Sequence, residues 1–171
     1  MKSTALDPLF GAWFAGLCDG EGHFEVRKGT RRREGDRAWM CAFHLLLRAD
    51  DEDVLEEIRE RTGLGSILWS RRTTVRGWNP SKGWHVFRKA EVAALADIFR
   101  QYPLRTRKAR DCQVWQEAVD AWLIKDYDRM AALGAQIRQV RKWSGVDLEP
   151  VAVEPSPQLA LIGRATKPES A

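Results

Sequence analysis

The sequence predicts an α+β domain built on a four-stranded antiparallel sheet. Two pairs of segments alternate apolar and polar residues, each pair joined by a link rich in turn residues, and helical periodicity precedes, separates and follows the pairs. No alternation of strand and helix typical of a parallel sheet appears. A length of 171 residues suits one domain, which we assign to residues 1–145. Residues 146–171, which contain four prolines and no clear periodicity, are expected to form a flexible C-terminal tail.

The first predicted helix is apolar throughout. Asp7 and Pro8 provide an N-cap and a proline at the first helical position, and residues 9–18 read LFGAWFAGLC. Glycines at 20 and 22 favour left-handed or extended backbone, so we expect the helix to end near residues 19–20 and Glu21 to lie in a turn before a strand. A helix apolar on every face needs protein on every face, and this one is too short to cross a bilayer.

Two pairs of small residues lie four positions apart in this helix: Gly11 with Ala15, and Ala12 with Gly16. A glycine inside a helix costs about 1 kcal/mol relative to alanine, and close approach of a second backbone would offset that cost. For this segment taken alone, the simplest interpretation is a tightly packed core helix.

The first strand pair is predicted at residues 22–33 and 37–48, as a long hairpin. In its first strand Phe24, Val26 and Lys28 share one face, and His23, Glu25, Arg27 and Gly29 share the other, which is polar. The second strand alternates less clearly, with Phe43, Leu45 and Leu47 on one face and Ala42, His44 and Leu46 on the other.

The remaining elements follow the same logic. Acidic residues at 50–53 favour a helix start, and Gly63 and Gly65 mark its stop. A second strand pair is predicted at 66–72 and 84–88 around a loop at 77–81. Three helices follow, at 90–101, 109–122 and 127–143.

Positive charge is unevenly distributed. The net charge is +4, but residues 22–110 contain 20 Lys and Arg against 12 Asp and Glu, and residues 61–90 contain seven basic residues and no acidic one. A run of charge is commonly only a solvated face, yet a basic block without compensating acids favours a polyanion as partner.

The three cysteines, Cys18, Cys41 and Cys112, are odd in number and lie in apolar or helical segments, which argues against disulfides and for a reducing compartment. They also lack the spacing of zinc ligands. Neither a signal peptide nor a membrane span is evident, so we expect no membrane partner and a cytoplasmic protein, associated with the nucleoid if it binds DNA.

Residues 14–22 read FAGLCDGEG and are followed by Phe24. This string resembles the signature of the LAGLIDADG homing endonucleases, with phenylalanine and cysteine in place of two apolar residues at 14 and 18. The resemblance covers about residues 7–125, and the order of elements predicted above matches the αββαββα core of that family. It implies an intron-encoded, site-specific endonuclease that hydrolyses phosphodiester bonds in double-stranded DNA.

The resemblance assigns the metal-binding carboxylate to Glu21, with the carbonyl of Gly20 as a further ligand. Two such carboxylates held together bind hard divalent cations, most plausibly Mg²⁺, with Mn²⁺ as a substitute. It also implies a basic active-site residue near the start of the helix after the second strand pair and a polar one at the end of the second strand. Lys108 or Arg107 fits the former, with lysine more usual there, and Arg48 the latter.

The polar sheet face is the predicted DNA-binding surface, because a twisted antiparallel ribbon fits the major groove. An ordinary solvated sheet face is the alternative. The predicted contacts are Glu25, Arg27, Arg31, Arg33, His44, Ser66, Leu68, Ser70, Arg72 and Arg76. His23 is expected to contact DNA or water rather than act as a general base, and no catalytic role is assigned to His44 or His85.

One motif per chain implies a homodimer on a near-palindromic site, with Gly11, Ala12, Ala15 and Gly16 lining the helix contact. Two alternatives remain open for the function. One is an RNA-binding intron maturase that aids splicing, and the other is a DNA-binding regulator that has kept the fold without the chemistry.

Overall fold

The computed structural model describes residues 6–29, 39–70 and 79–141. In chain order its elements are α1 Pro8–Glu21, β1 Gly22–Lys28, β2 Trp39–Arg48, the short 3-10 turn η1 Ala49–Asp51, α2 Glu52–Thr62, β3 Ser66–Trp69, β4 Ser81–Val86, α3 Lys89–Gln101, α4 Lys108–Leu123 and α5 Tyr127–Val140. The strands form one antiparallel sheet in the order β1-β2-β4-β3. The predicted α+β class and four-stranded antiparallel sheet are confirmed.

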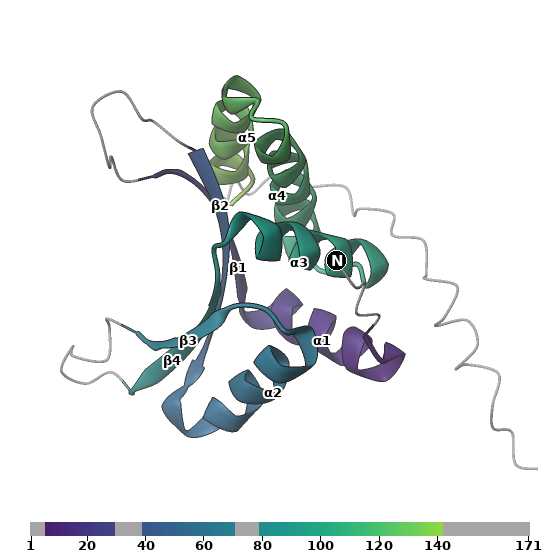
Figure 1. Ribbon diagram of the computed structural model, residues 1–171, viewed down its shortest axis with the longest axis vertical. Helices are drawn as coiled ribbons and strands as arrows, with labels where there is room; N and C mark the ends of the chain where they lie inside the picture. The colour runs from purple at the N-terminus through teal and green to yellow at the C-terminus, as the bar shows by residue number, and fades with distance from the viewer. Residues whose placement is uncertain (1–5, 30–38, 71–78, 142–171) are drawn as a thin grey trace, which may run out of the picture.

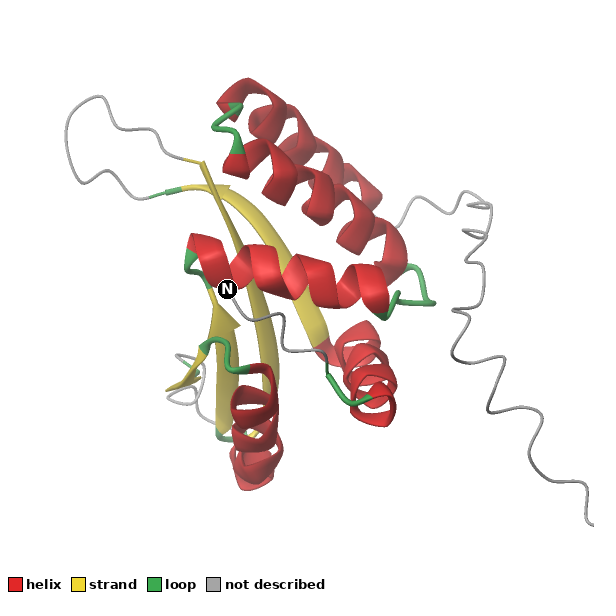
Figure 2. Cartoon of the chain, turned by 45° about the vertical axis from the view of Figure 1, so that its right-hand side comes forward, coloured by secondary structure: helices red, strands yellow, loops and turns green. Residues whose placement is uncertain are grey.

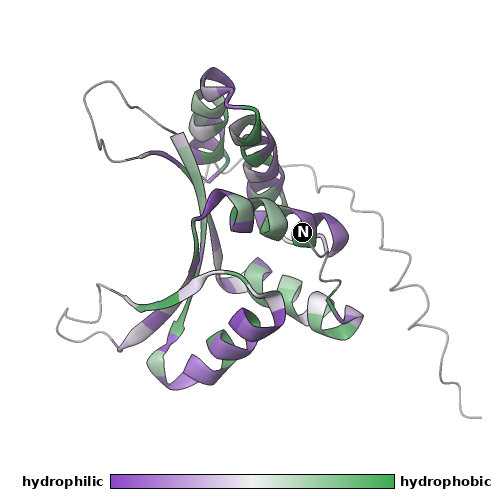
Figure 3. Ribbon diagram, viewed as in Figure 1, coloured by the Kyte–Doolittle hydropathy of each residue, from purple (hydrophilic) through white to green (hydrophobic). Residues whose placement is uncertain are grey.

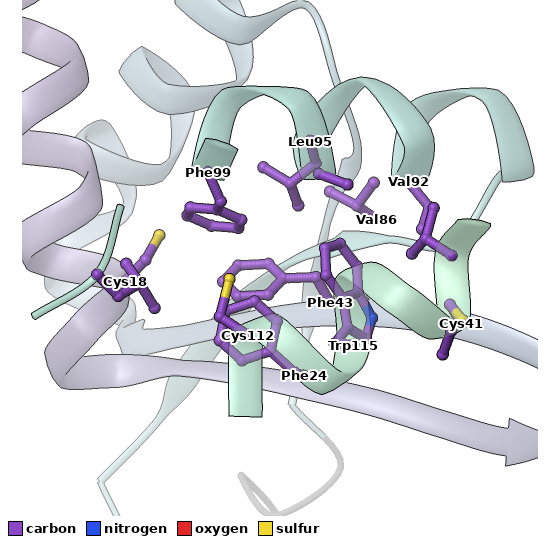
Figure 4. Packing of buried hydrophobic residues seen from close by; sticks show 14 of the residues in the cluster. Cys18, Phe24, Cys41, Phe43, Val86, Val92, Leu95, Phe99, Cys112 and Trp115 are labelled. Atoms are coloured by element: carbon purple, nitrogen blue, oxygen red, sulfur yellow. The ribbon is translucent and has the colours of Figure 1, made fainter. Parts of the chain in front are cut away.

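The helices of these residues pack on one side of the sheet, and the opposite side carries none of them (Figures 1 and 2). The core lies between the two layers and is rich in aromatic rings. The ring of Phe24 lies 5.0 Å from that of Phe43 and 5.2 Å from that of Trp115, and Phe99 of α3 closes the cluster from above (Figure 4). Among the described residues, one face of the sheet is therefore not covered by helices.

Helix α1 runs directly into the sheet. The carboxylate of Asp7 accepts from the backbone N–H groups of Leu9 and Phe10, as an N-cap should. The helix continues through Glu21, one to two residues beyond the predicted end, and β1 begins at once. Gly22 is extended, at φ −69°, and it is needed for space: a Cβ there would lie 2.5 Å from the carbonyl oxygen of Cys18.

Within the single chain, α1 is buried on one side only. Phe10, Phe14 and Cys18 are buried against the core, but Leu9 is 69% exposed and Trp13 44%. The exposed side is nevertheless hydrophobic, in contrast to the hydrophilic outer side of α2 (Figure 3). Apolar content alone does not show whether such a helix is covered by its own chain or by another.

Several boundaries differ from those predicted. Strand β1 ends at Lys28, β2 begins at Trp39, and the predicted hairpin residues between them lie mostly outside the described ranges. Strand β3 ends at Trp69 rather than 72. Strand β4 begins at Ser81, three residues before the predicted start, because β2 continues to Arg48 and offers Ser81 and Lys82 pairing partners.

The helix ends were predicted more closely. Gly63 adopts left-handed backbone at φ 66° and ends α2, as expected of a glycine after a helix. The start of α2 is later than predicted, because residues 49–51 form the 3-10 turn first. Helices α3, α4 and α5 begin within one residue of their predicted starts.

Candidate functional site

The C-terminal end of α1 and the N-terminal end of α4 meet at one corner of the domain. Glu21 is the last residue of α1 and is exposed there. Beside it the ammonium group of Lys108 donates to the carbonyl oxygen of Gly20 at 2.6 Å. The backbone carbonyl that precedes Glu21 and a cation 88 positions further along the chain are thus brought together.

Asp19 fixes this corner. Its carboxylate accepts from the backbone N–H groups of Arg105 and Thr106, both at 2.9 Å, and from the hydroxyl of Thr106 at 2.6 Å. The Thr106 hydroxyl oxygen in turn accepts from the backbone N–H of Lys108 at 3.2 Å. The segment before α4 is therefore attached to the helix end, and Lys108 is directed to Gly20.

The structure distinguishes the two basic candidates at this position. Lys108 contacts the end of α1, whereas Arg107 is the exposed residue that caps α4. Arg48 at the end of β2 instead binds Asp50, at 2.9 Å from Nε and 2.6 Å from Nη2, because η1 turns Asp50 back beside it. This pairing lowers the pKa of the Asp50 carboxyl. A catalytic role for Arg48 stays a prediction.

The open face of the sheet carries a connected polar network. By register, His23, Glu25 and Arg27 of β1 lie across from His44, Ala42 and Met40 of β2, on one face. Glu25 accepts from Arg27 Nε at 2.9 Å and lies 3.1 Å from His44 Nε2. His44 Nδ1 is 2.6 Å from Nδ1 of His85 on β4. The network thus runs across three strands.

This network shifts the titration of its members. The hydrogen bond from His44 lowers the pKa of Glu25, and Arg27 adds to the effect. Burial lowers the pKa of His23, with a smaller contribution from the charge of Arg141, and burial together with His44 lowers that of His85. The carboxylate is therefore kept ionised and the two imidazoles are kept neutral at neutral pH.

Known proteins resemble this chain in sequence and in fold. The LAGLIDADG endonuclease family matches residues 14–119, most of the described chain and the whole corner. The protein belongs to the LAGLIDADG endonucleases. The chain is also 25% identical over 146 residues to the probable intron-encoded endonuclease Cox1-I1b of Schizosaccharomyces pombe, covering 82% of this chain but only 36% of that protein.

Solved LAGLIDADG structures share the fold. An archaeal intron-encoded homing endonuclease, I-Vdi141I complexed with DNA, superposes with a TM-score of 0.65 at 18% identity, covering 82% of this chain and 89% of that one. I-SmaMI bound to uncleaved DNA in the presence of calcium ions gives a TM-score of 0.65 at 20% identity, covering 75% of this chain and 45% of that one. I-TnaI gives 0.59 at 17% identity, covering 76% and 94%.

The predicted DNA contacts divide into two groups. Glu25, Arg27, His44, Ser66 and Leu68 share the open face, since Ser66 and Leu68 pair with His85 and Gly83 of β4. Ser70 follows β3 and its backbone N–H donates to the carbonyl of Ser81. Arg31, Arg33, Arg72 and Arg76 lie outside the described residues.

The four predicted dimer residues lie on two sides of α1. Gly11 and Ala15 are buried within the chain, and a Cβ on Gly11 would lie 2.4 Å from the ring of Tyr102. Ala12 and Gly16 are exposed, and a Cβ on Gly16 would meet no atom within 4 Å. The close approach at Gly11 is thus to its own chain, and only Ala12 and Gly16 present small residues to the outside.

Two residues near the site were missed from the sequence. Arg141, directly after α5, donates to Asp111 of α4 at 2.8 Å and to the carbonyl oxygen of Phe24, so it lies beside the start of β1. Nothing in its local sequence indicates this. His85 was the other, and alternation could have placed it, because the buried residues Trp84 and Val86 flank it.

Cys18, Cys41 and Cys112 are buried and free. Within residues 6–29, 39–70 and 79–141, no cluster of three or more His, Cys, Asp or Glu side chains could hold a metal ion. In the same ranges, none of the helices has the length and apolar character needed to span a membrane.

Proposed function

We propose that the protein is a site-specific homing endonuclease that binds a near-palindromic DNA site as a homodimer and cuts both strands with divalent metal. The observation that carries this proposal is the corner at which Glu21, the Gly20 carbonyl and the Lys108 ammonium meet, next to an open sheet face. The superposed I-Vdi141I and I-SmaMI structures are complexes with DNA, which supports the choice of partner.

The residues at the corner fit a hard cation. A carboxylate and a backbone carbonyl are oxygen donors of the kind that Mg²⁺ and Mn²⁺ prefer, and Glu21 is exposed where a second copy could approach it. One chain supplies one such carboxylate, so a complete site takes Glu21 from each of two chains. When bound there, a divalent cation lowers the pKa of a coordinated water and neutralises charge on the phosphate.

The protein's own groups have distinct tasks. Lys108 holds a positive charge at the corner, where it stabilises negative charge that develops on the scissile phosphate. Asp19 keeps Lys108 in place through Arg105 and Thr106. The Gly20 carbonyl oxygen has two lone pairs, so the Lys108 contact leaves one for a metal ion. Arg107 is proposed to bind a phosphate outside the cleavage point.

The open sheet face positions the DNA. Arg27 and the histidines lie along the strands that lead away from the corner. A sheet that lies in the major groove therefore directs the DNA backbone toward Glu21. The predicted contacts Arg31, Arg33, Arg72 and Arg76, which lie outside the described residues, add positive charge for binding phosphate in this proposal.

Glu21→Gln tests the proposal. The substitution removes a metal ligand but no sheet contact, so we expect cleavage of supercoiled plasmid carrying a selected site to be lost while DNA affinity, measured with Ca²⁺, stays within about tenfold. Glu60→Gln on α2, an exposed glutamate far along the chain from the corner, is the matched control and should cut normally. Retention of more than a few per cent of the cleavage rate in Glu21→Gln would contradict the assignment.

A further inference from the structure

His85 is held in a defined orientation in the middle of the open sheet face. It pairs by register with His44 on one side and Ser66 on the other. Its ring leans along β4 over Gly83: a Cβ at Gly83 would lie 2.5 Å from His85 Nε2. The His85 and His44 rings are edge to face, with centroids 4.9 Å apart. Only a glycine at 83 leaves room for this arrangement.

The hydrogen bonds fix which nitrogens carry protons. The ionised carboxylate of Glu25 can only accept, so His44 Nε2 must donate to it. In a neutral His44 the other nitrogen, Nδ1, then accepts, and Nδ1 of His85 must be its donor across 2.6 Å. The remaining lone pair of a neutral His85 is therefore on Nε2. The lowered pKa values of Glu25 and His85 agree with these protonation states.

Two leucines flank this nitrogen. Leu46 of β2 and Leu68 of β3 both pair with Gly83, from opposite sides, and are 38% and 52% exposed. Their exposed side chains offer apolar contact area to a partner that is apolar at the same place. The patch formed by Leu46, His85 and Leu68 thus offers one hydrogen-bond acceptor between two apolar surfaces.

In the major groove, an A·T pair matches that combination. Adenine presents its 6-amino group as a donor, and its partner thymine presents the C5-methyl group on the same edge. A C·G pair has a donor but no methyl group, and guanine presents acceptors. On the basis of the proposed DNA-binding function, we propose that His85 is a specificity-determining residue. It accepts from the adenine amino group, while Leu46 and Leu68 contact the thymine methyl group. Each half-site then carries an A·T pair at the position that faces His85.

Protonation of His85 changes the base that it prefers to contact. Adding a proton to His85 Nε2 turns the acceptor into a donor, which favours guanine N7 and O6 over the adenine amino group. The titratable and charged groups of the same polar network are His44 beside His85, Glu25 and Arg27 of β1, and His23, which Asp111 and Arg141 influence. Of these, His44 contacts His85 directly, with 2.6 Å between the two Nδ1 atoms.

The first test uses the free protein and does not depend on DNA. The chain has three histidines, so ¹⁵N–¹H correlation spectra of imidazole-labelled protein can be assigned with single substitutions. At about pH 8 we expect His44 to carry its proton on Nε2 and His85 on Nδ1. The opposite tautomer of His85 would overturn the inference, whatever the protein does to DNA.

The second test uses DNA sites selected by cleavage from a randomised library. Selection with His85→Phe should relax the preference at one pair per half-site, whereas Gln136→Ala on α5, which is exposed and belongs to neither corner nor sheet, should leave the selected site unchanged. At that pair we expect purine in place of adenine, and uracil in place of thymine, each to weaken binding roughly threefold to tenfold. The same analogues at an A·T pair unaffected by His85→Phe are the internal control.

The outcomes separate the two proposals. If the protein neither binds nor cuts any site, the proposed function fails and the base assignment fails with it. If it cuts, but the analogues at the relaxed pair have no effect or His85→Phe relaxes no pair, the inference on His85 is wrong while the endonuclease assignment stands.

Discussion

At the scale of single residues, the candidate site depends on side chains that hold others in place. Asp19 makes no contact with the carbonyl of Gly20, yet its three hydrogen bonds to Arg105 and Thr106 place Lys108 there. On the sheet, Glu25 likewise accepts from His44 and so holds that ring in place. In both cases a carboxylate that only accepts defines the orientation of its donors.

Lys108 and Arg107 should behave differently when their charge is removed. We expect Lys108→Met to slow cleavage by about a hundredfold or more, because a positioned cation near a scissile phosphate stabilises the transition state. Arg107→Met should mainly weaken DNA binding, and less than tenfold. Single-turnover cleavage rates and binding with Ca²⁺ separate the two effects. A larger loss of rate in Arg107→Met than in Lys108→Met would reverse the assignment.

The histidines of the sheet face should make the fold sensitive to acid. The pKa values of His23 and His85 are lowered in the folded chain, so the unfolded chain takes up protons first as pH falls below about 7. Their contribution to stability is complete above the unfolded pKa of about 6.5 and is lost as pH falls through the folded values. Glu25, whose pKa is also lowered, adds a loss at more acidic pH.

We therefore expect the free energy of unfolding to decrease from about pH 7.5 to about pH 5. His23→Gln should make this decrease smaller, while Gln136→Ala should leave it unchanged. Urea denaturation followed by circular dichroism at each pH measures both. A stability that rises on acidification over this range would show that the imidazoles are not kept neutral.

At the scale of elements, α1 has one side that packs against its own chain and one side that does not. Gly11 faces the ring of Tyr102, where a Cβ would be 2.4 Å from a ring carbon, whereas Gly16 faces open space. The same substitution should thus have opposite effects at the two positions. It also separates packing within the chain from packing between chains.

Gly11→Ala should lower the free energy of unfolding by about 1 to 3 kcal/mol, because the ring must move. Gly16→Ala should raise it by up to about 1 kcal/mol in the monomer, because alanine favours the helix and meets no atom. Chemical denaturation at low protein concentration measures both. Equal destabilisation at the two positions would mean that α1 packs differently from the arrangement described here.

Local signals predicted much of this architecture. Asp7, Pro8 and Gly63 mark helix ends by backbone chemistry that acts within a few residues, and all three act as expected. Alternation placed His23, Glu25 and Arg27 on one face of β1, and the motif placed Glu21 at the end of α1.

What the sequence missed depends on long-range contacts. The sequence favours Lys108 over Arg107 by resemblance, but the contact of Lys108 with Gly20 depends on Asp19, 87 positions before Thr106. The start of β4 at Ser81 depends on where β2 ends. Arg141 reaches β1 only because α5 folds back along α4. Sequence periodicity does not indicate such contacts, because they depend on how the elements pack against one another and not on the residues within each element.

At the scale of the whole molecule, the exposed apolar side of α1 and the single Glu21 point to the same assembly. Leu9, Trp13 and Gly16 recur at helical spacing on a surface that leads to Glu21. The superposed structures differ in how much of their own length this chain covers: 89% of I-Vdi141I but 45% of I-SmaMI. One such unit supplies one carboxylate and one sheet face, and two strands of DNA require two of each.

A homodimer with two-fold symmetry meets these requirements together, since it places each residue near the axis against its own copy and directs two sheet faces to opposite half-sites. We therefore expect a dimer by analytical ultracentrifugation and a near-palindromic selected site. Gly16→Leu should separate the chains and abolish cutting of both strands, because a large side chain keeps the two α1 backbones apart. The monomer should stay folded and keep its circular dichroism spectrum, because the space at Gly16 is open. Trp122→Phe, a partly buried position on α4 away from this surface, is the control and should stay dimeric. A wild-type chain that sediments as a monomer on DNA and still cuts both strands would show that Glu21 does not need its copy.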